Sequence, residues 1–138
     1  MKRYFPLLFL LVMFACNTEK PQTITELFER PDCSGECYVS MPCEGQEIVL
    51  QVYLTGSNVL ANGPQILFMR DPDDIYKTIQ VNFDDSVDKE LIKKIDDEFD
   101  QTVYLRGLIS GYDLLNAEFC KRAHIITIQS NEDIWFEE

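Results

Sequence analysis

Four cysteines offer the clearest chemistry in the body of this sequence: Cys33, Cys37, Cys43 and Cys120. Three of them lie within one short segment, so complete disulfide pairing must join that segment to Cys120. Such a bridge would close a loop of roughly 80–90 residues and stabilise the fold by about 4 kcal/mol in the chain-entropy model. The alternatives are a zinc site and free thiols, but the spacing lacks the paired C-x-x-C knuckles of common zinc ribbons. We predict two disulfides, with their pairing left open, and no metal site.

Other reactive groups give little support for catalysis. The single histidine, His124, lies within an apolar stretch, where a structural histidine is more common than a general base. Cys120 lies four residues earlier, and a strand would hold these two positions about 13 Å apart. The acidic segment 71–74 has carboxylates that suit calcium but lacks the remaining ligands of an EF-hand, which favours an ordinary turn. The sequence therefore predicts a protein that is not an enzyme and holds no cofactor.

The first sixteen residues have the order of an export signal. A short basic start precedes an apolar run over residues 4–14, and Ala15 then precedes Cys16. The run is too short for a stable membrane span, which needs about 20 residues. A cysteine directly after a small residue resembles the signal of bacterial lipoproteins. The resemblance implies that residues 1–15 are removed and that lipid on Cys16 anchors the protein in a membrane of the cell envelope, facing the periplasm or the exterior.

The charge of the chain is strongly acidic. The whole chain has 12 Lys and Arg against 24 Asp and Glu, and the signal holds two of the cations and no acid, so the mature charge is 10 minus 24, or −14. Such a field repels phosphate backbones and anionic headgroups. We therefore predict that nucleic acid is not a partner. The acidic surface suits solubility, with attraction of cations as the alternative.

The elements that would position these groups follow from local patterns. We expect a tether over residues 16–22 and a single globular domain over residues 23–138. Alternation of apolar and polar residues predicts strands, and an apolar stripe with a four, one, three, four spacing predicts one amphipathic helix. The expected elements are a short helix at 23–30, a disulfide-held loop at 32–45, strands at 47–54, 65–70, 77–83, 101–109 and 123–129, a helix at 87–99 capped by Asp84, Asp85 or Ser86, and a loop from Gly111 to Cys120.

Three strands, a helix and two further strands resemble the layout of an OB-fold, a small five-stranded Greek-key barrel that is mainly β. The segments that carry the likeness are 47–54, the hairpin 66–83, the helix and 103–109. Gly107 lies within the fourth strand, and a glycine there often marks a bulge or a sharp bend. The alternative is an α+β sheet with one helix packed across it.

Two groups of side chains are candidates for binding. OB-folds bind ligands across the second and third strands, where this chain offers Arg70, Tyr76 and Lys77. Trp135 and Phe136 form an apolar pair near the end of the chain and are a candidate anchor for a partner protein, with completion of the core as the alternative.

The expected function is a lipid-anchored, non-catalytic binding or assembly module of the bacterial cell envelope. Its partner would be an envelope protein, a glycan or a small ligand. The alternative is an acidic accessory protein of the envelope that binds cations or a small cationic ligand.

Overall fold

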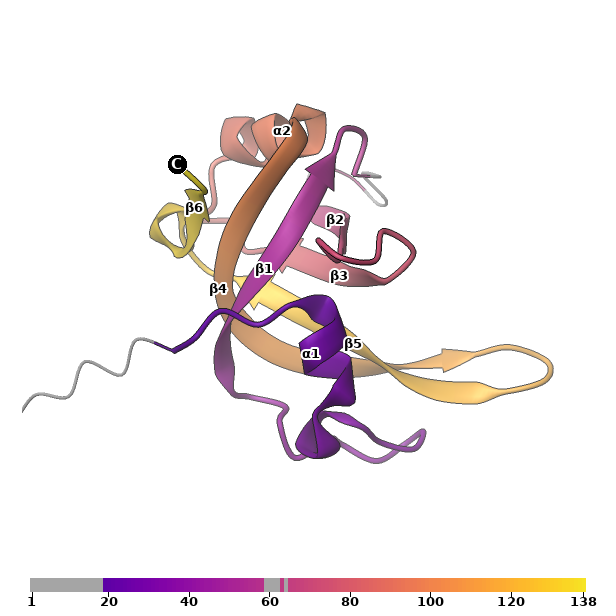
Figure 1. Cartoon of the computed structure of the whole chain (residues 1–138). Helices are drawn as coiled ribbons and strands as arrows, with labels where there is room; N and C mark the ends of the chain where they lie inside the picture. Colours follow the sequence, from indigo (N-terminus) through magenta and orange to yellow (C-terminus); the bar gives the residue numbers. More distant parts are fainter. Residues whose placement is uncertain (1–18, 59–62, 64) are drawn as a thin grey trace, which may run out of the picture.

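The computed structural model describes residues 19–58, 63 and 65–138, so the predicted signal and Cys16 lie outside the described residues. The elements appear along the chain in the order shown in Figure 1. They are α1 (Ile24–Glu29), the 3-10 turn η1 (Pro31–Cys33), β1 (Glu47–Thr55), β2 (Ile66–Arg70), β3 (Thr78–Phe83), α2 (Lys89–Asp97), β4 (Phe99–Leu115), β5 (Cys120–Ile128), η2 (Asn131–Asp133) and β6 (Ile134–Phe136).

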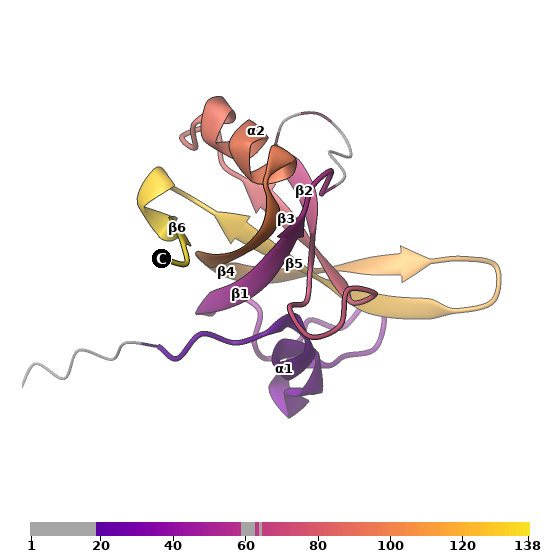
Figure 2. The same cartoon turned by 45° about the horizontal axis from the view of Figure 1, so that its top comes forward.

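Five strands close into a ring in the order β1, β2, β3, β5, β4 and back to β1. β3 and β5 run parallel, and the other neighbours in the ring run antiparallel. α2 connects β3 to β4 and lies at one end of the ring (Figures 1 and 2). This strand order confirms the prediction of a mainly β, OB-like barrel. The alternative, an α+β sheet with one helix packed across it, is wrong because β1 pairs with β4 and closes the sheet.

Alternating apolar side chains fill the ring as the sequence predicts. The inward residues of β1 and β3 are buried, and the outward residues between them are mostly half-buried or exposed: Ile48, Leu50, Val52 and Leu54 point inward from β1, and Ile79, Val81 and Phe83 from β3. Ile92 and Ile95 of α2 are buried in the same core. Burial of aliphatic side chains of this size contributes roughly 1.5–3 kcal/mol each, so the ring is the main source of stability.

The limits of α2 differ from the prediction at both ends. Asp88 caps the helix, and its carboxylate accepts a hydrogen bond from the Glu90 backbone at 3.0 Å. The expected capping residue Asp84 instead begins a turn, because its carbonyl accepts from the Val87 backbone. Phe99 opens β4 and is largely exposed, so the apolar stripe of the helix ends at Ile95. The prediction that Asp84, Asp85 or Ser86 caps this helix is therefore wrong.

β4 is long because it serves two partners in succession. Its first part pairs with β1, from Phe99 opposite Thr55 to Leu108 opposite Glu47, and its second part pairs with β5 as far as Leu115. Gly107 lies at the change of partner. A Cβ atom there would come within 2.6 Å of the Thr127 carbonyl oxygen, so the strands approach closely only because this residue is glycine.

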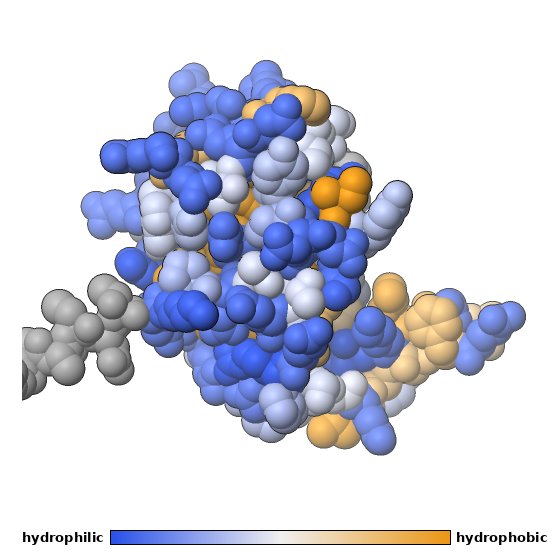
Figure 3. All heavy atoms as spheres, in the orientation of Figure 1, coloured by the Kyte–Doolittle hydropathy of each residue, from blue (hydrophilic) through white to orange (hydrophobic). Residues whose placement is uncertain are grey.

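The second part of β4 and the first part of β5 form a hairpin that projects from the ring, here called the hairpin and defined as residues 110–124 (Figures 1 and 2). The predicted loop between Gly111 and Cys120 is wrong. Gly111 and the polar turn residues beyond it resemble a loop signal, but Asn116 alone closes the turn, bonding the Phe119 backbone through both its own N–H and its side chain. The exposed apolar residues of the hairpin are Leu114, Leu115 and Phe119, which contribute to the orange surface at the right of Figure 3.

Two disulfides join the segment before β1 to itself and to the hairpin. Cys33 pairs with Cys43 in the core, across ten residues of sequence. Cys37 pairs with Cys120 at the surface, across 83 residues. The prediction of two disulfides, one of which closes a long loop to Cys120, is confirmed. Residues 34–46, here called the disulfide loop, are thereby fixed to the hairpin at the start of β5, next to the hairpin turn.

The start of the described chain is also attached to the ring. The Gln22 backbone donates to the Val49 carbonyl at 2.9 Å and accepts from the Gln51 backbone at 2.7 Å. Thr23 and Glu26 then form a reciprocal capping box that starts α1. A free tether can therefore extend at most to residue 21.

A candidate ligand cavity

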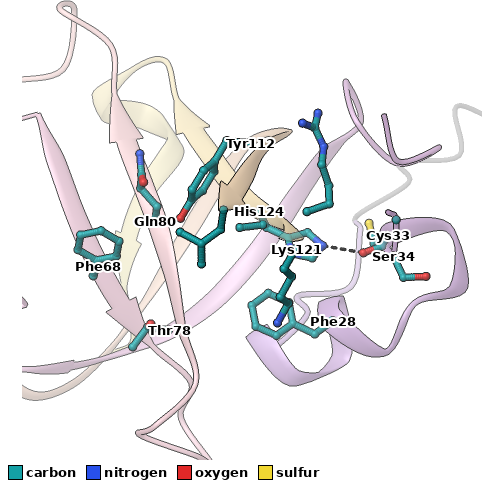
Figure 4. Close-up of a pocket in the computed structure, with 13 residues that line it drawn as sticks. Phe28, Cys33, Ser34, Phe68, Thr78, Gln80, Tyr112, Lys121 and His124 are labelled. Atoms are coloured by element: carbon teal, nitrogen blue, oxygen red, sulfur yellow. Dashed lines mark hydrogen bonds between the residues drawn. The ribbon is translucent and has the colours of Figure 1, made fainter. Parts of the chain in front are cut away.

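A cavity of about 330 Å³ opens where β3 and β5 separate (Figure 4). The two strands pair from Gln80 opposite Ile125 to Phe83 opposite Ile128. Ahead of these residues, β2 and β3 form one wall of the cavity and the hairpin forms the second. α1 and the start of the disulfide loop form the third wall. The outer face of β2 and β3 is the ligand-binding face of OB-folds, so the cavity lies beside the region that the sequence predicts.

Aromatic rings from three elements line the cavity. Phe28 comes from α1, Phe68 from β2 and Tyr112 from β4. All three are half-buried, so each ring keeps a face toward the cavity or its rim. Gln80 and Thr78 add polar groups from β3. Phe68 and Tyr112 occupy outward positions of their strands, which alternate with the buried core residues.

His124 forms part of the same wall and is held by two contacts. Its Nε2 donates to the Cys33 carbonyl at 2.6 Å, and its ring stacks on Phe28 with centroids 4.8 Å apart. Burial lowers the pKa of His124 below its ordinary value, which outweighs the opposite effect of the hydrogen bond to Cys33. The imidazole is therefore neutral at neutral pH and held in one orientation in the cavity wall. This agrees with the structural role expected from the sequence.

Arg122 links the hairpin to the disulfide loop. Its guanidinium donates to both carboxylate oxygens of Glu44, at 2.7 and 2.9 Å, and to Asp113 at 3.3 Å. The hydrogen bond to Glu44 is the main reason that the pKa of Arg122 rises above its ordinary value. A Cβ atom at Gly111 would lie 2.5 Å from Glu44 Oε1, so glycine provides the space for this pair. The two carboxylates largely neutralise Arg122.

Lys121 is the second cation of the lining and lies at the rim of the cavity. It is exposed, and it takes part in none of the ion pairs formed within the described ranges. The side chains that line the cavity include no carboxylate. Lys121 is thus the one lining cation whose charge no ion pair among the described residues balances, in a chain whose net charge is −12.

The predicted face of Arg70, Tyr76 and Lys77 lies outside the cavity lining. Arg70 donates to Thr55 Oγ1 at 3.2 Å and to the Ile75 carbonyl at 2.9 Å. Lys77 donates to Thr25 Oγ1 at 3.2 Å, which fastens the β2–β3 turn to α1. Tyr76 is 90% exposed. The structure therefore uses the two cations of this group to hold the turn in place.

The acidic turn between β2 and β3 is built around Asp71. Its buried carboxylate accepts hydrogen bonds from the backbones of Thr25 at 2.7 Å, Asp73 at 2.8 Å and Asp74 at 3.1 Å. Burial raises the pKa of Asp71, but these hydrogen bonds more than compensate, so the pKa lies below its ordinary value. Residues 71–74 thus form a turn that the Asp71 carboxylate holds in place. Among the described residues, no group of three or more His, Cys, Asp or Glu side chains is placed to hold a metal ion.

Trp135 and Phe136 belong to β6, which pairs with β4 next to the ring. The Trp135 ring stacks on Tyr104 with centroids 5.8 Å apart, and Arg106 covers it at 5.4 Å. Phe136 packs against the core, with the Lys94 ammonium 4.6 Å from its centroid. Both side chains are half-buried and have partners within the chain. These contacts fit the alternative interpretation, in which the two side chains complete the core. Their use as a partner anchor stays a prediction.

Sequence reasoning missed the aromatic side chains and the lysine that line the cavity. Tyr112 and Lys121 fall in the segment predicted as a loop, so no face could be assigned to them. Alternation from Tyr112 to Leu114, followed by Phe119, was the available signal of a continuing strand. Phe28 was assigned to a helix, but contacts distant in sequence place that helix at the cavity, among them the stack of Phe28 on His124 and the bond from Lys77 to Thr25.

The strand order defines an OB-like barrel, and comparisons with solved structures give low similarities. An aspartyl tRNA synthetase from Entamoeba histolytica has a TM-score of 0.46 and 9% identity over 68% of this chain, which spans 19% of the synthetase. A mitochondrial single-stranded DNA-binding protein from S. cerevisiae has a TM-score of 0.45 and 9% identity, over 69% of this chain and 97% of that protein. The Plasmodium falciparum SSB, in complex with single-stranded DNA, has a TM-score of 0.43 and 15% identity, over 67% of this chain and 94% of the SSB. No protein-family model and no curated protein matches the chain.

These neighbours correct one prediction. Two of them are single-stranded DNA-binding proteins, which contradicts the exclusion of nucleic acid as a partner. The exclusion uses the net charge of the whole chain, whereas a ligand meets the local charge of its site. Net charge governs solubility and long-range steering. It does not determine what a cavity lined by Lys121 and Arg122 accepts.

No helix in the described part of the chain has both the length and the apolar character needed to cross a membrane.

Proposed function

We propose that this protein is a lipid-anchored, non-catalytic binding module of the bacterial cell envelope. The observation that carries the proposal is the cavity beside β2 and β3, with its aromatic walls and its volume of about 330 Å³. Ligand pockets are typically concave, about 300–1,000 Å³ in size, and lined by apolar and aromatic side chains with a few polar groups. The cavity has each of these properties.

The covalent support of the cavity is consistent with an envelope location. Cys33 lies in its lining, and the Cys37–Cys120 bridge holds the hairpin that forms a second wall. Structural disulfides persist in oxidising compartments and are rare in the bacterial cytoplasm. A protein that is exported before it folds can form both bridges, and its cavity walls are then fixed.

The position of the proposed anchor would direct the hairpin away from the membrane. Cys16 lies three residues before Glu19, and an extended chain spans at most about 3.6 Å per residue, so the lipid would hold Glu19 within roughly 11 Å of its own attachment point. Glu19 and the hairpin lie on opposite sides of the ring (Figure 1). The cavity wall formed by the hairpin would then face the soluble compartment, where a ligand can reach it.

The test of anchoring is Cys16→Ala in the full chain expressed in a bacterium. We expect the parent to incorporate a labelled fatty acid and to sediment with membranes, and the variant to lose both properties while it keeps its two disulfides. Cys33→Ala is the matched control, because it also removes one thiol but should leave the label in place. Equal labelling and sedimentation of parent and Cys16→Ala would contradict the proposal.

The alternative of a cation-binding accessory protein stays a prediction. The acidic charge motivates it, but the side chains that line the cavity include no carboxylate.

A further inference from the structure

We propose that the cavity binds a small aromatic carboxylate, that is, a flat apolar ring that carries one anionic group. This inference rests on the proposed binding function and names its ligand class. It depends on three features of the cavity: the sign of its charge, the arrangement of its rings and its size.

The sign of the charge points to an anion. The chain carries 24 Asp and Glu against 12 Lys and Arg. The cavity lining nevertheless contains two cations and no carboxylate. A cationic ligand would meet Lys121 at the rim and would find no acceptor of opposite charge among the lining side chains.

The two cations have different roles. Arg122 already donates to Glu44 and Asp113, so its charge is balanced inside the protein. Lys121 has no such partner among the described ion pairs, and the strand register, with Leu114 opposite Lys121 and Tyr112 opposite Ala123, places it on the same face of the hairpin as Tyr112. A lysine whose stem follows an apolar surface places its ammonium at the edge of that surface. Lys121 is therefore the group that meets the anion.

The rings supply the second half of the recognition. Phe68 and Tyr112 come from opposite walls, and the Phe28–His124 stack closes the third side. Stacked and edge-to-face ring contacts stabilise a flat group beyond the area it buries. Because His124 is neutral and its Nε2 is occupied by the Cys33 carbonyl, it contributes a ring surface and not a charge.

The volume limits the ligand to one ring and a short polar arm. At about 330 Å³, the cavity lies near the lower end of the range for ligand pockets. Two sources share this chemistry: a free aromatic acid, and the C-terminal aromatic residue of a polypeptide. In both, a carboxylate lies a few bonds from a ring, which matches the adjacency of Lys121 to the aromatic walls.

The experiment measures binding of N-acetyl-L-phenylalanine and its uncharged amide to the full, disulfide-bonded chain in mild detergent, by calorimetry and by the rise in Tm. We expect the acid to bind at least about tenfold more tightly than the amide, which corresponds to ~1.4 kcal/mol. Lys121→Gln should abolish this difference. Lys89→Gln, the same change at an exposed lysine of α2, should preserve it.

Two further probes distinguish the sources and the competing ligand classes. A tetrapeptide ending in phenylalanine with a free carboxylate would bind more tightly than the N-acetyl acid if the ligand is a polypeptide terminus, and no more tightly if it is a free acid; both results support the proposed chemistry. Equal binding of acid and amide would overturn it, as would an unchanged preference in Lys121→Gln. Tighter binding of oligothymidylate than of the acid would also overturn it. The Cys16→Ala assay is independent of these results, so failure here leaves the anchoring proposal separately tested.

Discussion

The ring and the hairpin are stabilised in different ways. In the ring, each strand buries its own alternating apolar residues, and the contacts are distributed over many aliphatic side chains. In the hairpin, the exposed side chains include several large apolar residues, and the two strands are held by a few specific links to the disulfide loop. These links are the Cys37–Cys120 bridge, the pair of Arg122 with Glu44, and the bond from the Tyr38 backbone to Asp113.

The difference shows where the cavity obtains its rigidity. A projecting two-stranded hairpin is marginally stable on its own in water, because one face cannot be buried. The disulfide loop is cross-linked to the outer part of the hairpin and so keeps Tyr112 and Lys121 opposite β2 and β3. The ring provides the fold, and the cross-links provide the second wall of the cavity. Substitutions in the two regions should therefore have different signatures.

The largest effect is expected for Gly107→Val in the ring. A side chain at this position would overlap the Thr127 carbonyl, which lies 2.6 Å from the Cβ position, and the Ile128 side chain at 2.9 Å. Because the backbone cannot move aside without separating β4 from β5, we expect failure to fold, or a loss of more than about 5 kcal/mol in the free energy of unfolding. Chemical denaturation measures the loss. Leu108→Val, on the outward side of the same strand, is the control and should cost less than about 1.5 kcal/mol.

The next effect is expected for removal of the surface disulfide by Cys37→Ser with Cys120→Ser. The bridge closes 83 residues, and the chain-entropy model gives about 4–5 kcal/mol for a loop of this length. The loss should be seen under oxidising conditions and should nearly vanish in reductant, where the parent also lacks the bridge. Denaturant unfolding with and without reductant makes the comparison.

The buried bridge provides the contrast. Cys33→Ala with Cys43→Ala removes a closure of ten residues, for which the same model gives about 2–3 kcal/mol. Part of its effect should persist in reductant, because these side chains are also packed in the core. If both double variants lost the same stability in reductant, the two regions would not differ in the way described.

The ring could be predicted from the sequence because its signals are local. Alternation at Ile48–Leu54 and Ile79–Phe83 specifies inward faces without knowledge of any partner strand. The limits of α2 could not be predicted as well, because Asp84 and Asp88 are equally suitable caps in sequence. The choice depends on the long-range bond from the Asp84 backbone to the Ile128 carbonyl.

The cavity was less predictable because its walls meet through contacts that are distant in sequence. Arg122 bonds Glu44 across 78 positions, and His124 bonds Cys33 across 91. No local sequence pattern predicts either of these hydrogen bonds. The candidate face at Arg70 and Lys77 has suitable residue types, but their hydrogen bonds to Thr55, Ile75 and Thr25 became visible only with the turn and α1 in place.

The smallest effect on stability is expected from a change of pH. It acts through His124, the cavity residue at the end of the hairpin that contacts Phe28 and Cys33. Its folded pKa is lowered mainly by burial, so between the folded pKa and the unfolded value of about 6.5 the unfolded chain binds more protons than the folded chain. The contribution of this group to stability is therefore present above about pH 6.5 and is lost as pH falls through the folded pKa. We expect His124→Gln to flatten the pH dependence of Tm between pH 7 and pH 5 while leaving the acid limb set by the carboxylates. Thermal unfolding across this range measures it. If the slope is the same in His124→Gln, protonation of His124 in the parent does not lower the stability of the fold. The contacts to Phe28 and Cys33 would then not hold this side chain neutral.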